Sequence, residues 1–169
     1  MATESDLTHP LSWPDTLERL RDFQSRLLLA IHGLGETDLG RPERDGRWSI
    51  RDVVAHLGDF EMVTGLRIRS ALADDRPAYM RLNQERFVAA LHQHDSFAEL
   101  IEALGFHRRA NVALVERLSD AELAREGEHP EYGTLTIRQT MARVQRHQEK
   151  HLRQIEAIKS TLGLHASDS

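Results

Sequence analysis

The chain has 169 residues, a length typical of one domain with its own buried core. Its 22 basic residues stand against 27 acidic ones, and this net charge of −5 argues against a general nucleic-acid-binding role, which needs a basic face. The absence of cysteine excludes disulfides, thiolate metal ligands and a cysteine nucleophile. We expect no membrane span and no signal peptide, and therefore a cytoplasmic protein.

The first predicted helix begins after Ser12, where Pro14 stands near the first helical position and Asp15 follows the cap by three residues. Its apolar residues recur with a period close to 3.6. The same pattern predicts that the helix ends near Gly33 or Gly35, and a polar loop follows.

The second predicted helix begins at Ser49, which forms a capping box with Asp52. Trp48 precedes the cap, where an apolar side chain can pack back onto the helix. One apolar stripe runs along this helix to about Leu72, and it contains Val53, His56, Phe60 and Val63. His56 is therefore expected on or beside the buried face.

A third long helix is predicted to begin at Ser96, which forms a capping box with Glu99, and to include the apolar positions of residues 97–115. Two shorter segments, residues 84–91 and 119–123, could each add a helical turn. Aspartates and a proline break the helical pattern after the second helix.

The fourth long helix is capped by Thr136 and Gln139 and ends at Gly163. The preceding GEHPEYGT segment is expected to be a loop, and no segment alternates with period 2 for long enough to predict a strand. The sequence thus predicts an all-α, four-helix bundle, with residues 1–169 as one domain and an ordered core of about residues 12–163.

Three histidines are the most informative residues of the chain. His147 and His151 lie four residues apart on the fourth helix, so their imidazoles share one face. His56 lies on the inner edge of the second helix. If these two helices face each other, the three imidazoles can hold one divalent ion and leave a coordination position open. Nitrogen ligands of this kind suit Zn²⁺, Ni²⁺, Cu²⁺ or Fe²⁺.

The spacing alone leaves another interpretation open. Histidine pairs four residues apart occur by chance, and a histidine on an apolar edge is often a hydrogen-bonded core residue. An HxxxH pair without a flanking glutamate is a much weaker signal than HExxH.

The surrounding motifs resemble the DinB-like superfamily over about residues 13–158. The resemblance rests on WSIRDVVAHL, on the turn HPEYGTLT and on HQEKHLRQI. It implies a four-helix bundle in up-down-down-up order, often a homodimer, with one metal ion bound by His56, His147 and His151.

The resemblance says less about the reaction. Members include S-transferases that conjugate low-molecular-weight thiols such as bacillithiol or mycothiol, thiol-dependent isomerases, metal-dependent hydrolases and proteins linked to stress responses. The leading expectation is a metal-dependent transferase that joins a small thiol cosubstrate to an electrophilic small molecule. A metal-dependent hydrolase and a non-catalytic metal-binding stress protein are the alternatives.

Several polar residues are weaker candidates for the site. Asp59 and Gln154 each lie one turn from a histidine and could form a hydrogen bond near the site, although Gln154 could equally cap a packing edge. Glu149 is expected to point away as a solvated charge. Arg108 and Asn111 could bind an acidic substrate, or could instead be a surface arginine and a helix-face asparagine.

The remaining cations and histidines are expected to have other roles. Arg67 and Arg69 are expected on a solvated face, with a carboxylate-bearing thiol as the alternative partner. His129 is expected to order its turn. Four further histidines are expected to be exposed, namely His92, His94, His107 and His165.

Overall fold

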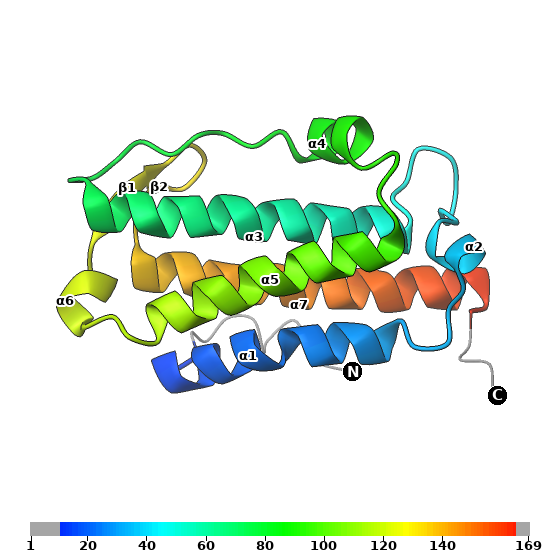
Figure 1. The fold of residues 1–169 in the computed structure, drawn as a ribbon, viewed down its shortest axis with the longest axis horizontal. Helices are drawn as coiled ribbons and strands as arrows, with labels where there is room; N and C mark the ends of the chain where they lie inside the picture. The colour runs from blue at the N-terminus through cyan, green and yellow to red at the C-terminus, as the bar shows by residue number, and fades with distance from the viewer. Residues whose placement is uncertain (1–10, 165–169) are drawn as a thin grey trace.

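The computed structural model describes residues 11–164. Its frame is four long helices, namely α1 (Trp13–Ala30), α3 (Ile50–Ala73), α5 (Phe97–Val115) and α7 (Ile137–Leu162). Helices α1 and α7 run in one direction and α3 and α5 in the other (Figure 1). The predicted up-down-down-up bundle is therefore confirmed.

The connections contain five short elements, namely α2 (Glu36–Leu39), α4 (Gln84–Leu91), α6 (Asp120–Leu123), β1 (Glu126–His129) and β2 (Gly133–Thr136). The expectation of a loop without strands at GEHPEYGT was wrong, because β1 and β2 form an antiparallel hairpin. Each strand has only four residues, too few for a period-2 pattern to emerge. Gly133 supplies the positive φ of 68° that the turn requires.

The predicted helix starts are confirmed by their hydrogen bonds. Reciprocal capping boxes form at Ser49, Ser96 and Thr136, so two backbone N–H groups are satisfied at each helix start. At the other end of α7, Gly163 adopts the left-handed conformation expected of a C-cap. These local bonds fix the residues at which α3 and α7 begin.

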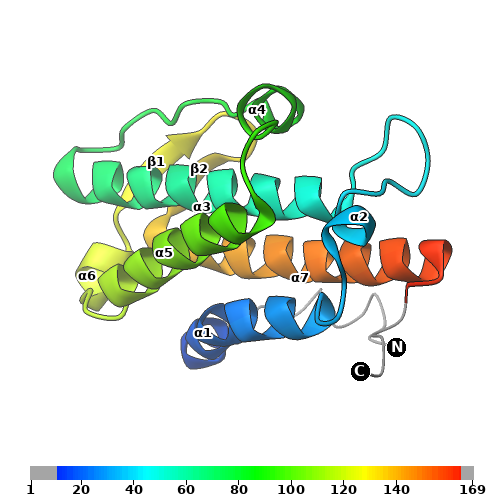
Figure 2. The ribbon, with the colours of Figure 1, turned by 45° about the vertical axis from the view of Figure 1, so that its right-hand side comes forward.

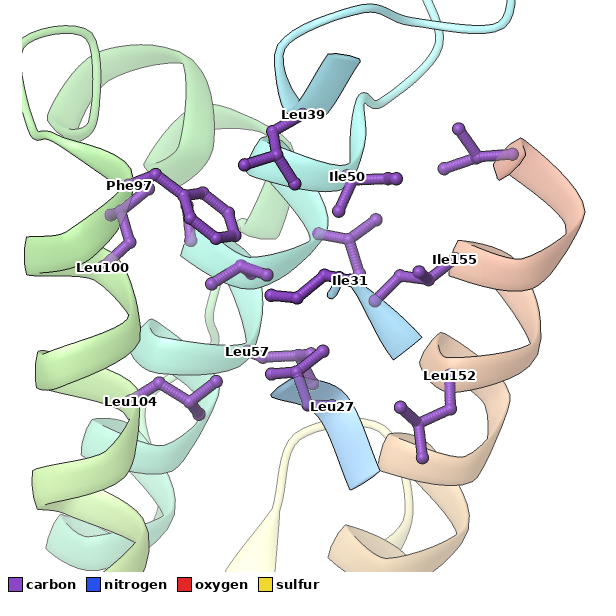
Figure 3. Packing of buried hydrophobic residues seen from close by; sticks show 14 of the residues in the cluster. Leu27, Ile31, Leu39, Ile50, Leu57, Phe97, Leu100, Leu104, Leu152 and Ile155 are labelled. Atoms are coloured by element: carbon purple, nitrogen blue, oxygen red, sulfur yellow. The ribbon is translucent and has the colours of Figure 1, made fainter. Parts of the chain in front are cut away.

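The apolar faces of the long helices meet in two buried clusters. One of them joins the start of α3 to α1, α5 and the end of α7, and contains Leu27, Leu57, Leu104 and Ile155 (Figure 3). Gly105 of α5 permits close packing here, since a Cβ at this position would overlap the side chain of Gln24 on α1. The glycine that weakens α5 as an isolated helix thus leaves room for the Gln24 side chain of α1.

The chain between α3 and α4 crosses the outside of the bundle as a long strap (Figures 1 and 2). Tyr79 N–H donates to the carbonyl of Glu128 at 2.9 Å, and Glu128 N–H donates to the carbonyl of Pro77 at 2.9 Å. The ring of Tyr79 lies on Gly127, where any side chain would overlap it. The strap and the hairpin are thereby fixed to each other beside α3.

Within residues 11–164, none of the helices is both long enough and apolar enough to cross a membrane.

Candidate metal centre

The three predicted histidines converge between α3 and α7. Nε2 of His147 lies 3.1 Å from Nε2 of His56 and 3.2 Å from Nε2 of His151. A tetrahedral ion with metal–nitrogen bonds of about 2.0–2.1 Å separates its ligand nitrogens by about 3.3 Å. The spacing of the three nitrogens therefore fits a single small divalent ion.

Burial keeps all three imidazoles neutral. It lowers the pKa of His56 to about 3, with smaller effects from His151 and Lys150. It lowers the pKa of His147 to about 2, again with repulsion from the neighbouring histidines and cations. For His151 burial lowers the pKa to about 4, although the hydrogen bond to Gln154 raises it. Neutral imidazoles have the free lone pair that a metal ion requires.

Gln154 fixes the orientation of one ring. Its Oε1 lies 2.8 Å from Nδ1 of His151 and accepts that N–H, which leaves the Nε2 lone pair directed at the other two histidines. The remaining Nδ1 atoms, on His56 and His147, are buried without a hydrogen-bond partner in residues 11–164. The convergence of three neutral Nε2 atoms fits a bound cation, which accepts all three lone pairs at once, whereas a single Nε2–H proton on His147 could satisfy only one of its two short contacts.

Aromatic rings hold the imidazoles from the sides. Phe60, one turn after His56, stacks on the ring of His147 with centroids 3.9 Å apart. Trp48 lies 5.0 Å from the His56 ring and 6.4 Å from the His151 ring, centroid to centroid. Trp48 was predicted only as a helix staple, and Phe60 only as part of an apolar stripe. Their proximity in sequence to His56 was the signal that could have identified them.

Two cavities meet at the centre. The outer cleft has a volume of about 740 Å³ and is bordered by His147, His151, Gln154, Trp48 and Lys150. This volume lies in the usual range for small-molecule sites. The inner pocket has a volume of about 70 Å³ and extends from His147 towards the hairpin. His147, Gln84 and Tyr132 border both cavities.

Arg108 and Asn111, the candidates for substrate binding, lie instead in a buried cluster with Glu61. Arg108 Nη2 pairs with Glu61 Oε1 at 2.7 Å, and Asn111 Nδ2 donates to Glu61 Oε2 at 3.0 Å. Arg108 and Asn111 are each 2% exposed, and neither borders the two cavities. The structure thus places them between α3 and α5, as part of the packing.

Asp59 is directed away from the three histidines. Its Oδ2 lies 2.9 Å from Nε2 of His92, whose Nδ1 lies 2.6 Å from Asp95. His92 was expected to be exposed, but this bridge from α3 to the end of α4 makes it half-buried. Glu149 does point away from the pair as predicted, yet it is not solvated, because it forms a bidentate ion pair with Arg26 of α1.

The other sequence candidates divide between surface and interior. His94 is exposed and His107 half-buried, and His165 lies outside the described residues. Arg69 is exposed as expected. Arg67 was expected on a solvated face, but it is buried and contacts His129 in the hairpin at 3.1 Å.

Comparisons with known proteins point to one family. The sequence profile of the DinB superfamily matches residues 19–155. "Putative metal-dependent hydrolase YfiT" from Bacillus subtilis is 26% identical over 151 residues, covering 87% of this chain and 84% of its own length. A protein from Oceanobacillus iheyensis that is also described as a metal-dependent hydrolase is 25% identical over 140 residues, which cover 83% of this chain and 81% of that protein.

Solved structures agree on the fold. The structure of Bacillus subtilis YfiT, described as an unusual four-helix bundle, superposes with a TM-score of 0.84 at 20% identity, covering 98% of this chain and 92% of that one. The four-helix bundle protein TT2238 superposes with a TM-score of 0.66 at 23% identity, and the superposition covers 86% of this chain and 99% of TT2238.

Proposed function

Because the chain belongs to the DinB superfamily, we propose that it is a divalent-metal-dependent enzyme that acts on a small molecule, and that the reaction is hydrolysis. The observation that carries this proposal is the convergence of three neutral imidazoles at the edge of a 740 Å³ cleft. The description of YfiT and of the Oceanobacillus protein as metal-dependent hydrolases supports the choice of reaction.

In this proposal His56, His147 and His151 hold the ion, and the protein fixes their geometry. When bound, a divalent cation supplies Lewis-acid chemistry that acidifies water or a thiol and polarises a carbonyl. Gln154 holds the proton of His151 at Nδ1, so that Nε2 stays available. Trp48 and Phe60 pack against the imidazoles, and the outer cleft gives access to the cluster.

Thiol transfer is the second candidate reaction. Three neutral ligands leave the full positive charge of the ion uncompensated, and such a charge stabilises a thiolate. The chain has no cysteine of its own, so the thiol would be a small cosubstrate. The cleft is wide enough for a cosubstrate beside an electrophile.

The test is a matched set of assays on protein loaded with zinc, nickel or ferrous iron. We expect hydrolysis of chromogenic esters or amides without added thiol, and its loss in His56→Ala but not in His94→Ala, which removes an exposed histidine. Turnover of an electrophile only when a small thiol is added would instead identify the transferase. If neither activity exceeds the His56→Ala background, the enzyme proposal fails and a non-catalytic role for the metal remains.

Assembly as a homodimer, implied by the family resemblance, stays a prediction. Exposed apolar side chains such as Leu29 on α1 and Phe106 on α5 offer surface for such a contact. Light scattering that gives the mass of one chain at micromolar concentration would contradict it.

A further inference from the structure

The inner pocket has a composition unlike that of the outer cleft. It lies between α3, α7 and the hairpin, and its polar border includes Arg67, Arg143, Thr140 and His129. The volume of about 70 Å³ is enough for a small polar group but not for a whole substrate. His147 borders the pocket, so a group held there lies directly beside the three-histidine cluster.

Two residues that border this pocket carry buried hydrogen-bond donors without acceptors. Arg67 and Thr140 are each 8% exposed, and Arg67 Nε and Thr140 Oγ1 are buried without a partner in residues 11–164. Buried donors of this kind cost about 1–3 kcal/mol each when they stay unsatisfied. Arg67 of α3 and Thr140 of α7, the residues that carry these unpartnered atoms, both border the same small cavity.

The two ring nitrogens of His129 both lie against N–H donors, although only one of them can accept a hydrogen bond. The backbone N–H of Glu131 donates to its Nδ1 at 3.2 Å, while Arg67 Nη1 lies 3.1 Å from its Nε2. Burial and the nearby charges of Arg67 and Arg143 lower the pKa of His129 to about 4, so the ring is neutral and carries one proton. If the proton is on Nδ1, it faces the N–H of Glu131, and if it is on Nε2, it faces an N–H of Arg67.

The charges around the pocket favour an anion. Arg67 and Arg143 contribute two positive charges, and Arg143 is held over the Tyr132 ring with its Cζ 3.3 Å from the ring centroid. Glu131 contributes one negative charge at the border, but it lies 3.8 Å from Arg81 in an ion pair. The balance at the pocket is therefore positive even before any metal ion is counted.

We infer that the inner pocket binds a small oxyanion, a carboxylate or phosphate carried by the substrate, and so positions the reacting bond beside the three histidines. This inference rests on the proposed function and narrows it to anionic small molecules. After small shifts of these side chains, an oxyanion in the pocket can accept hydrogen bonds from Arg67, Thr140 and Arg143, and it separates the opposed N–H groups of Arg67 and His129.

The test is a binding titration on the full-length, zinc-loaded protein, followed by NMR of backbone amides in the hairpin. Acetate and inorganic phosphate are the two probes, each raised to about 100 mM because millimolar affinity is expected for so small a ligand. We expect saturable shifts at Tyr132 and Gly133 with at least one probe. Tighter binding of acetate would indicate a planar carboxylate as the ligand, and tighter binding of phosphate would indicate a tetrahedral oxyanion.

Matched variants assign the binding to the pocket. Arg143→Gln and the near-isosteric Thr140→Val should each weaken binding about tenfold, whereas Arg146→Gln, which removes an exposed arginine of the same helix, should leave it unchanged. Zinc content must be equal in all variants, which excludes an effect through the ion. Absence of saturable shifts with both probes, or equal affinity in Arg143→Gln and Arg146→Gln, would overturn the inference. Because binding needs no turnover, this result is independent of whether hydrolysis is observed.

Discussion

The buried pair of Glu61 and Arg108 gives a sharp prediction about what holds α3 against α5. Glu61 is 1% exposed and Arg108 2% exposed, and the two charges are 2.7 Å apart. At an effective dielectric constant of about 20, their attraction is about 6 kcal/mol. The desolvation of the two ions costs several kcal/mol each, so the intact pair contributes little net stability.

Removing one partner has a different effect from removing both. Glu61→Leu leaves the guanidinium of Arg108 buried without its counter-ion, and its Nε and Nη1 already lack partners in residues 11–164. Burial lowers the pKa of Arg108, and the Glu61 carboxylate acts in the opposite direction. We expect Glu61→Leu and Arg108→Met each to cost about 3–5 kcal/mol of unfolding free energy. The double variant should cost only about 1–2 kcal/mol, chiefly because Asn111 loses one hydrogen-bond acceptor.

The assay is urea denaturation followed by circular dichroism, as a double-mutant cycle. With a denaturant slope of about 2 kcal/mol per molar, each single variant should lower the midpoint by about 2 M, and the double variant by much less. Zinc content per folded chain should not change, because neither residue borders the metal cavities. Additive costs in the double variant would refute the ion-pair argument, and loss of zinc from folded single variants would refute the purely structural role.

Three further predictions concern the metal centre and its surroundings. Gln154→Leu should weaken zinc affinity about 10–100-fold, measured by competition with a chromogenic chelator, because His151 loses the acceptor that orients it. Zinc at about 100 times its Kd should stabilise the native chain by about 2.7 kcal/mol. For a domain of this size that raises Tm by about 5–10 °C in calorimetry, and the increase should vanish in His151→Ala. Burial lowers the pKa of His92, but its hydrogen bonds to Asp95 and Asp59 outweigh this effect and raise it above the usual 6.5. The stability that His92 contributes is therefore complete below about pH 6.5 and is lost as the pH rises through the raised pKa. The difference in unfolding free energy between the natural chain and His92→Gln should shrink as the pH rises above about 6.5, and a constant difference would contradict this assignment.

Structural features were predictable from the sequence where the interacting residues are only a few positions apart in the chain. The helix starts at Ser49, Ser96 and Thr136 were predictable because a capping box needs only two side chains three residues apart. The hairpin was missed because its eight strand residues show no periodicity of their own. The hairpin also packs against the strap, where Tyr79 contacts Gly127 more than forty residues later in the chain.

Arg67 and Arg108 show the limit most clearly. Both look like ordinary helix arginines in the sequence, and nothing local distinguishes them from Arg69. The structure buries Arg67 against the hairpin and Arg108 against Glu61, because residues distant in the chain close over them. Gln154 was easier to identify, since a residue three positions after His151 on a helix is already within reach of it.

The sequence by itself determined the four long helices, the shared face of His147 and His151, and, through its motifs, the family. These depend on helical period and on caps, which act within a few residues. Only the tertiary structure decided that His56 lies 3.1 Å from His147, that the outer cleft gives access to the cluster, and that Arg67 and Thr140 border one small pocket. Those relations join residues far apart in the chain, 91 positions for His56 and His147, and they follow from the packing of α3 against α7, for which no local pattern exists.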